Sequence, residues 1–260
     1  MIALLAASLI SPFYVNVTPE IRTTYVSLGK IMEDRPMQTT LVRFGWDTGT
    51  FGRFGVYNFD VSSMTDRRSE DHRHCLYHTE FGPTWSYDFA LADDWKLCND
   101  LMCVWTLFRG WEKDSANDDY WWWQFSQSLE NPYLVPYYRM RRYCSGSFYF
   151  WFEVGVRRKF MLWDDWYVTP SVCVDGGNDL NYNRVIGKRT DGGDWGGGGV
   201  SSVTFRLEVG WQVETWMAVF AYVEQYEVVG HDARDMNARS SAPYAHNDWT
   251  LGGVGIRFKF

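Results

Sequence analysis

Hydrophobic and polar residues alternate with a period of two along much of this chain. The clearest stretch runs from Ser202 to Glu214, where one set of positions is apolar and the other is polar or small: Val203, Phe205, Leu207, Val209, Trp211 and Val213 against Thr204, Arg206, Glu208, Gly210, Gln212 and Glu214. Side chains of a β-strand point alternately to its two sides. The pattern therefore predicts a two-faced strand, because a helix would mix these residues on every face.

Two further segments carry the same pattern. Residues 78–92 alternate around Phe81, Trp85 and Phe89, and residues 148–162 set Phe150 and its apolar neighbours against charged residues. These strands are longer than the strands of soluble proteins, which usually have about five or six residues. They are long enough for the roughly 9 to 11 residues that a tilted strand needs to cross a bilayer. Pro83 interrupts the segment 78–92, which a strand tolerates at a bulge or bend.

The connections between strands are alternately short and long. Asp93-Asp94-Trp95 and Asp164-Asp165-Trp166 each join two predicted strands, and Glu214-Thr215-Trp216 has the same place in a third hairpin. Long polar stretches lie between these turns, at 63–77, 110–119, 175–199 and 230–247. In a barrel, this order puts the tight turns at one end and the long loops at the other, as in outer-membrane barrels with short periplasmic turns.

Continuing this pattern along the chain predicts twelve antiparallel strands: 23–32, 38–46, 51–62, 78–92, 95–109, 120–129, 133–142, 147–162, 166–175, 201–214, 216–229 and 248–260. The segment 133–142 has the weakest pattern, because Pro132 and Pro136 interrupt it. The segment 51–62 changes phase midway, as a bulged strand would. Ten strands is the alternative count.

Composition narrows the class of protein. Aromatic residues make up 18% of the chain, including 15 Trp, which favours strands and membrane-interface belts. The mean hydropathy is −0.34, and no apolar run approaches the roughly 18 to 20 residues of a spanning helix, which excludes a helical membrane protein. The net charge is −7, and no long basic stretch contains interleaved aromatics, so nucleic acid is not an expected partner.

The last strand, Trp249 to Phe260, gives the chain its resemblance to a known class. One face carries Val254, Ile256, Phe258 and Phe260, and the other carries Arg257 and Lys259. It resembles the C-terminal strand of Gram-negative outer-membrane β-barrels, where a final Phe on the lipid face is part of the insertion signal. The resemblance implies an all-β fold, a closed antiparallel transmembrane barrel, in contact with outer-membrane lipid and recognised by the barrel assembly machinery through this strand.

Periodicity alone leaves open which face of the strands points outward. A soluble lipocalin-like barrel or sandwich would keep its apolar face inside and a charged face outside. Here the polar face carries small and mixed residues, while aromatics gather at strand ends, which favours a lipid-facing exterior. We therefore expect a membrane girdle of aromatic residues: Trp95, Trp166, Trp216, Phe258 and Phe260.

The polar faces of the strands carry charges of both signs. In a barrel whose apolar face is outside, the expected lumen-lining residues are Glu80, Asp88, Glu153, Arg157, Lys159, Arg206, Glu208, Arg257 and Lys259. A complete network of ion pairs would seal the barrel, whereas a gap would leave a narrow and weakly selective pore. The sequence leaves both outcomes open.

The N-terminal segment has two interpretations. Ile2 to Ile10 is almost wholly apolar and has the length of a signal-peptide core, although no basic residues precede it. We favour the remnant of a signal peptide over an ordinary first strand. Residues 1–12 are therefore assigned to a signal remnant or N-terminal extension, and residues 13–260 to a single barrel domain.

Metal sites and catalytic groups have only weak signals. His72, His74, Cys75 and His78 are the densest group of potential metal ligands, but they lie in a charged polar segment, so no metal or cofactor is predicted. The five cysteines show no disulfide framework, although Cys75 could pair with Cys144. His78 and Ser86 are about 27 Å apart along one strand and cannot form a catalytic triad with Asp88.

The sequence thus predicts an outer-membrane β-barrel that is a passive channel for small solutes or a structural barrel. Two alternatives remain. One is a barrel enzyme, a protease or lipid-modifying enzyme, for which His231-Asp232 and Asp118-Asp119 offer a faint similarity to loop residues of outer-membrane proteases. The other is a surface adhesin acting through the long loops.

Overall fold

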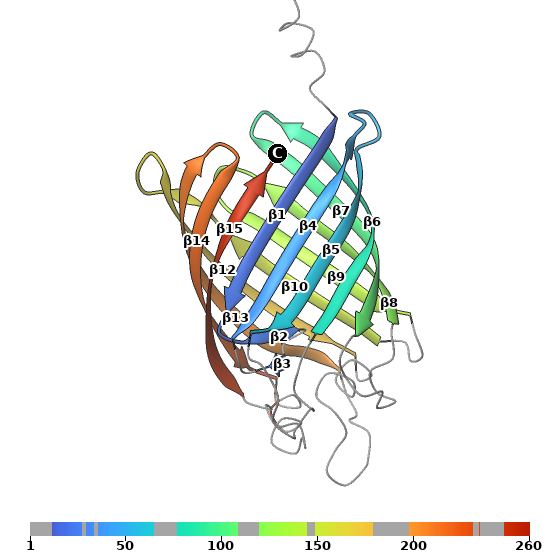
Figure 1. Ribbon diagram of the computed structural model, residues 1–260, viewed down its shortest axis with the longest axis vertical. Coiled ribbons are helices and arrows are strands. Elements are labelled where there is room, and N and C mark those ends of the chain that lie inside the picture. The colour runs from blue at the N-terminus through green and yellow to red at the C-terminus, as the bar shows by residue number, and fades with distance from the viewer. Residues whose placement is uncertain are drawn as a thin grey trace, which may run out of the picture.

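The computed structural model describes residues 12–27, 30–33, 36–64, 77–108, 120–144, 149–178, 198–230, 234 and 247–260. They form a closed antiparallel β-barrel (Figure 1). Its wall consists of twelve strands: β1 (Phe13–Arg22), β4 (Met37–Asp47), β5 (Arg53–Ser63), β6 (Tyr77–Ala92), β7 (Trp95–Phe108), β8 (Tyr120–Glu130), β9 (Val135–Tyr143), β10 (Tyr149–Arg157), β12 (Trp166–Gly177), β13 (Gly199–Glu214), β14 (Met217–Val228) and β15 (Asp248–Lys259). Each wall strand pairs with two neighbours, and the prediction of a closed all-β barrel of twelve strands is confirmed.

The first and last strands close the barrel. β1 pairs with β15 as well as with β4. Beyond the ladder, the backbone N–H of Val15 donates to the carbonyl oxygen of Phe260 at 2.9 Å, and the N–H of Phe260 donates to Val15 at 2.8 Å. Closure leaves no row of unpaired backbone groups at a sheet edge, which a strand in contact with lipid could not tolerate.

The two ends of the barrel differ. The short connections, including 93–94 and 215–216, lie at the end where β15 finishes, which we name the turn end (Figure 1). The long connections lie at the opposite end, named here the loop end. The arrangement matches the alternation of short and long connections in the sequence.

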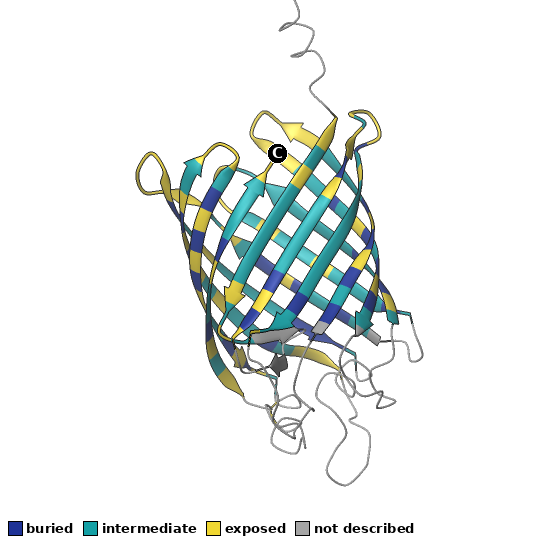
Figure 2. Ribbon diagram, viewed as in Figure 1, coloured by how far each residue is buried: buried dark blue, intermediate teal, exposed yellow. Residues whose placement is uncertain are grey.

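The apolar face of the strands points outward. In β13, Phe205 is 51% exposed, while Glu208 on the other face is 6% exposed. Figure 2 shows exposed and buried residues alternating along the wall strands, as the burial pattern of β14 also records. A soluble barrel would reverse this arrangement, so the outer surface is that of a membrane barrel.

The predicted first strand, 23–32, is wrong. The wall strand is β1 at 13–22, and the residues that follow it form a separate small hairpin of β2 (Tyr25–Ser27) and β3 (Lys30–Glu33) that pairs only with itself. Pro19 makes β1 hard to predict from the sequence, because a proline has no N–H to donate to the hydrogen bonds between strands. In the structure Pro19 pairs with Thr40 of β4 but has no paired residue in β15.

Two smaller predictions, the bulge in the segment 51–62 and the end of the strand 147–162, are also wrong. The pairing of Pro83 with Val56 keeps the register of its neighbours, so there is no bulge at Pro83, and β5 has no bulge either. The apparent change of phase in β5 arises because Tyr57 and Phe59 point inward with Val61, which is fully buried. The predicted strand 147–162 ends at Arg157, and only a short segment, β11 (Phe160–Met161), follows it.

The pairing shifts register elsewhere, next to the turns or the loop end. The shifts lie between Ala90 and Ala92 and between Gln212 and Glu214, with a third between Asp175 and Gly176. Among the described residues, no helix is long and apolar enough to cross a bilayer. The predicted signal remnant lies outside the described residues, apart from Pro12.

Candidate functional site

The barrel encloses a cavity of about 1050 Å³. Each of the twelve wall strands contributes to its lining, from Thr18 of β1 to Lys259 of β15. Many of these residues lie in the part of their strand that is nearer to the turn end, as Glu130, Gln212 and Lys259 do. The cavity therefore belongs to the barrel as a whole rather than to one local pocket.

Basic side chains outnumber acidic ones in this lining. Among the described residues that line the cavity, eight are basic and four are acidic: Arg43, Arg53, Arg139, Arg157, Lys159, Arg206, Arg257 and Lys259 against Asp88, Asp100, Glu130 and Glu208. The chain as a whole carries a net charge of −7. Basic residues are thus in excess in the lining of the cavity, where low-dielectric walls focus their field. Two of them, Arg139 and Arg206, also contact carboxylates outside this lining, those of Glu153 and Glu224.

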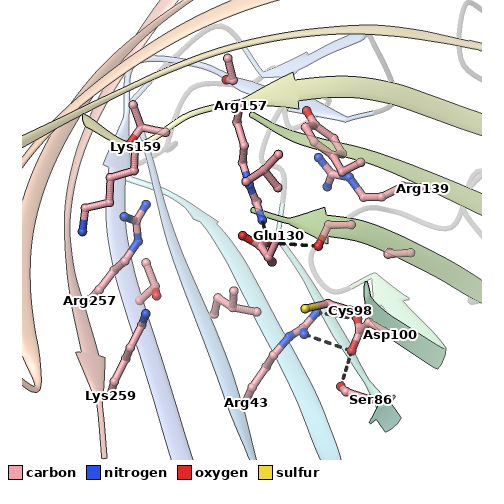
Figure 3. A pocket seen from close by; sticks show the side chains of 18 of the residues that line it. Arg43, Ser86, Cys98, Asp100, Glu130, Arg139, Arg157, Lys159, Arg257 and Lys259 are labelled. Carbon is pink, nitrogen blue, oxygen red and sulfur yellow. Dashed lines mark hydrogen bonds and ion pairs between the residues drawn. The ribbon is translucent and has the colours of Figure 1, made fainter. Parts of the chain in front are cut away.

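Several of these charges are paired across neighbouring strands. Arg43 lies 3.3 Å from Asp100, which also accepts a hydrogen bond of 2.7 Å from Ser86 Oγ. Arg157 lies 2.9 Å from Glu130 (Figure 3). These pairs hold two parts of the lining in place and cancel their own charge.

Asp88 and Glu208 each hold two cations. Asp88 lies 3.0 Å from Arg53 and 2.6 Å from Lys96. Arg257 donates to both carboxylate oxygens of Glu208, at 2.6 and 2.8 Å, and Arg206 lies 3.1 Å from the same carboxylate. Each carboxylate is therefore shared by two cations, and Arg206 also lies 3.3 Å from Glu224.

Two lysines of the lining have no carboxylate partner among the described residues: Lys159 and Lys259. Lys159 Nζ lies 3.9 Å from the centre of the Tyr167 ring, and the Tyr167 hydroxyl accepts a hydrogen bond of 3.2 Å from Arg257. Figure 3 shows Lys159, Arg257 and Lys259 gathered on one side of the cavity. Burial, together with Lys259 and Arg257, lowers the pKa of Lys159, which lies in the turn-end connection beyond β10.

Towards the loop end, the inward side chains are large and buried. Val104, Trp122 and Tyr143 pack together and are at most 1% exposed. Arg141 lies over the Trp122 ring, with its guanidinium carbon 3.9 Å from the ring centre, and donates to Gln124 at 3.0 and 3.1 Å. We name Val104, Trp122, Arg141, Tyr143 and Trp151 the loop-end layer. It narrows this part of the interior.

Seven of the nine residues predicted to line the lumen line the cavity: Asp88, Arg157, Lys159, Arg206, Glu208, Arg257 and Lys259. The other two, Glu80 and Glu153, are buried. Glu80 accepts a hydrogen bond of 3.1 Å from Tyr57, and Glu153 lies 2.5 Å from Arg139. Whether the seven line a conducting pore stays a prediction.

Sequence reasoning missed several charged residues of the lining: Arg43, Arg53, Asp100, Glu130 and Arg139. Arg53 lies on the segment whose phase was misread, and Arg139 lies on the segment broken by Pro136. Continuing the alternation of Tyr137, Arg139 and Arg141 across Pro136 would have found Arg139, because Pro136 pairs with Val156 without a shift of register.

The residues predicted to form the girdle lie at the turn end. Trp95, Trp166, Trp216 and Phe260 are all exposed, as Phe258 partly is. Trp216 stacks on Phe260 at 5.6 Å and on Phe258 at 6.2 Å between ring centres. Their contact with lipid stays a prediction.

Potential catalytic and metal-binding groups are held by other contacts or lie outside the described residues. His78 lies 3.8 Å from Glu80, Ser86 binds Asp100, and Asp88 holds its two cations. Within the described ranges, no group of three or more His, Cys, Asp or Glu side chains could hold a metal ion. His72, His74, Cys75, Asp118, Asp119, His231 and Asp232 lie outside those ranges, and Cys144 is a free thiol.

No protein-family model matches the chain. No curated protein matches it by sequence. Solved structures of outer-membrane barrels do match it by shape. The COG4313 outer membrane channel from Pseudomonas putida F1 has a TM-score of 0.57 at 7% identity, with 95% of each chain covered. The KdgM porin in complex with disordered oligogalacturonate has a TM-score of 0.51 at 9% identity, covering 95% of this chain and 99% of the porin.

These similarities define the class of the protein by its fold. The chain is a Gram-negative outer-membrane β-barrel in fold, as its C-terminal strand predicted. The predicted location in the outer membrane agrees with this fold. At identities below 10%, the comparisons extend to the fold and no further.

Proposed function

We propose that the protein is a passive channel for small solutes in the outer membrane, with a preference for anions. The observation that carries this proposal is the charge of the cavity lining, with eight basic and four acidic side chains among the described residues. A pore lined by one excess charge raises the local concentration of the opposite ion and favours its passage.

The fold supports this proposal. Both matched structures named above are described as a channel or a porin. The KdgM porin was solved with oligogalacturonate, a carboxylate-bearing sugar chain. A channel with a cationic lining and this fold is therefore suited to small anionic solutes, including acidic sugars.

The outer surface of the barrel has a matching role. We infer that the exposed apolar residues of the strands contact lipid and that Trp95, Trp166, Trp216, Phe258 and Phe260 form the girdle at the periplasmic interface. On the same basis, the turn end faces the periplasm and the strand that ends in Phe260 is recognised by the barrel assembly machinery.

Single-channel recording tests the proposal. The purified chain is refolded into a planar bilayer, and the reversal potential is measured in a KCl gradient, because K⁺ and Cl⁻ differ mainly in charge. We expect discrete conductance steps and a reversal potential displaced towards that of chloride. Steps with a cation preference would reject the anion channel, and silence from barrels that a gel-mobility assay finds folded and inserted would indicate a sealed structural barrel.

A further inference from the structure

The two basic residues of the lining that have no carboxylate partner among the described residues lie on one side of the cavity (Figure 3). Arg43 and Arg157 are each balanced by one carboxylate, Asp100 and Glu130. Lys159 and Lys259, in contrast, face the cavity without an ion pair to any described carboxylate. An anion that enters the cavity therefore gains most where these two ammonium groups lie.

The groups around the two lysines favour a particular kind of anion. Arg257 lies beside them, but both arms of its planar guanidinium already bind Glu208. The fork that would match a planar carboxylate is thus occupied. Each lysine offers a compact charge with three donors that can turn towards oxygens in any direction, which suits a tetrahedral oxyanion.

The surrounding structure holds this arrangement in place. The Tyr167 ring supports Lys159, and the Tyr167 hydroxyl is fixed by Arg257. The backbone N–H of Lys259 donates to the carbonyl oxygen of Trp216 at 2.9 Å, so the end of β15 is tied to the β13–β14 turn. Two positive charges are therefore held at the turn end of the cavity, and they can balance a group of charge −2.

We propose that Lys159 and Lys259 form a binding subsite for a doubly charged phosphate group, either free phosphate or the phosphate of a small monoester. The subsite deepens the proposed channel function and rests on it for its role, since it would concentrate such solutes at the turn end. Arg257 is a positioning residue here: it orients Tyr167 and adds positive charge without offering a free donor pair.

Binding can be measured separately from conduction. The refolded barrel in zwitterionic detergent is titrated calorimetrically with inorganic phosphate and with glucose 6-phosphate, with glucose as the neutral control. An ionic strength of about 0.1 M limits long-range attraction, because the Debye length is then about 10 Å. The test variant is K159Q/K259Q. The matched control is R53Q/K96Q, which removes the same charge from the pairs around Asp88. Circular dichroism and gel mobility verify that each variant is folded.

We expect saturable binding of one or both phosphate probes to the unmodified chain and none of glucose. K159Q/K259Q should weaken this binding at least ~10-fold, and R53Q/K96Q should change it by less than about threefold, since the charges that it removes are already paired. Absence of phosphate binding, or equal losses in the two variants, would overturn the subsite. Saturable binding by a barrel that does not conduct would support the subsite while rejecting the channel, and conduction without binding would do the reverse.

Discussion

Glu208 is the acidic centre of the most connected ion-pair group in the cavity, and its replacement by Gln tests how that group is built. Glu208→Gln keeps the shape of the side chain but removes the charge that two arginines share. Arg206 and Arg257 then lose the carboxylate that they share, although Arg206 keeps a contact of 3.3 Å with Glu224. We expect a less stable barrel with a stronger preference for anions.

The size of the stability loss follows from the contacts and their exposure. Three charge-assisted hydrogen bonds end on Glu208, and each such bond contributes about 1.5–3 kcal/mol when it is well buried. The Glu208 side chain is 9% exposed, but that of Arg257 is 31% exposed and borders the cavity, so water compensates much of the loss. We therefore expect Glu208→Gln to lower the free energy of unfolding by about 2 kcal/mol.

A double-mutant cycle isolates the pair. Urea unfolding in lipid vesicles, followed by tryptophan fluorescence, gives the free energies of Glu208→Gln, Arg257→Gln and the double variant. We expect a coupling energy of about 1–2 kcal/mol. The control cycle is Glu130 with Arg157, a pair at 2.9 Å whose side chains are 41% and 48% exposed, for which about 0.2–1 kcal/mol is expected. Effects of the Glu208 pair that add within about 0.3 kcal/mol would refute the reasoning.

Two further predictions concern the wall. Gly82→Ala should lower the folded yield sharply, because a Cβ at Gly82 would lie 1.9 Å from the backbone oxygen of Cys103. Gly252→Ala is the control and should not lower the yield, because no atom lies nearer than 3.4 Å to a Cβ at that position. Equal folded yields of the two variants on a gel-mobility assay would contradict this prediction. A variant that keeps Cys98 as its one cysteine should react with a water-soluble sulfonate thiol reagent and lose conductance, since Cys98 lines the cavity. The corresponding Cys103 variant should be protected in lipid vesicles, because Cys103 alternates with the inward Met102, and equal labelling of the two would reject the assignment of faces.

The sequence predicts the fold best where the two faces of a strand differ most. β13 and β15 were predicted within two residues because each sets aromatic and branched residues against charged or small ones. The misassigned first strand has a different cause. In a closed barrel each strand pairs with two neighbours, so β1 tolerates Pro19 at the loss of one hydrogen bond. The sequence pattern of β1 alone does not show this pairing on both sides.

The inward residues are harder to predict from the sequence than the outward ones, because they change from charged to apolar along the barrel axis. At the loop end the inward residues Val104, Trp122 and Tyr143 are as apolar as the outward Trp105 and Trp121, so β7 and β8 have two apolar faces. Asp100 then looks isolated in the sequence. Its partner Arg43 is 57 residues away and comes close only when the barrel closes.

The loop-end layer and the cationic cavity make the two mouths of the barrel unequal in an electrical sense. Fixed positive charge lies near one mouth, and tightly packed, largely apolar side chains lie near the other. This asymmetry makes the ion current depend on the direction of the applied field. In a conducting barrel, anion current is larger when the field drives anions in through the mouth that concentrates them. The sign of this rectification reports which way each barrel has inserted, so a single recording reveals orientation without any chemical label.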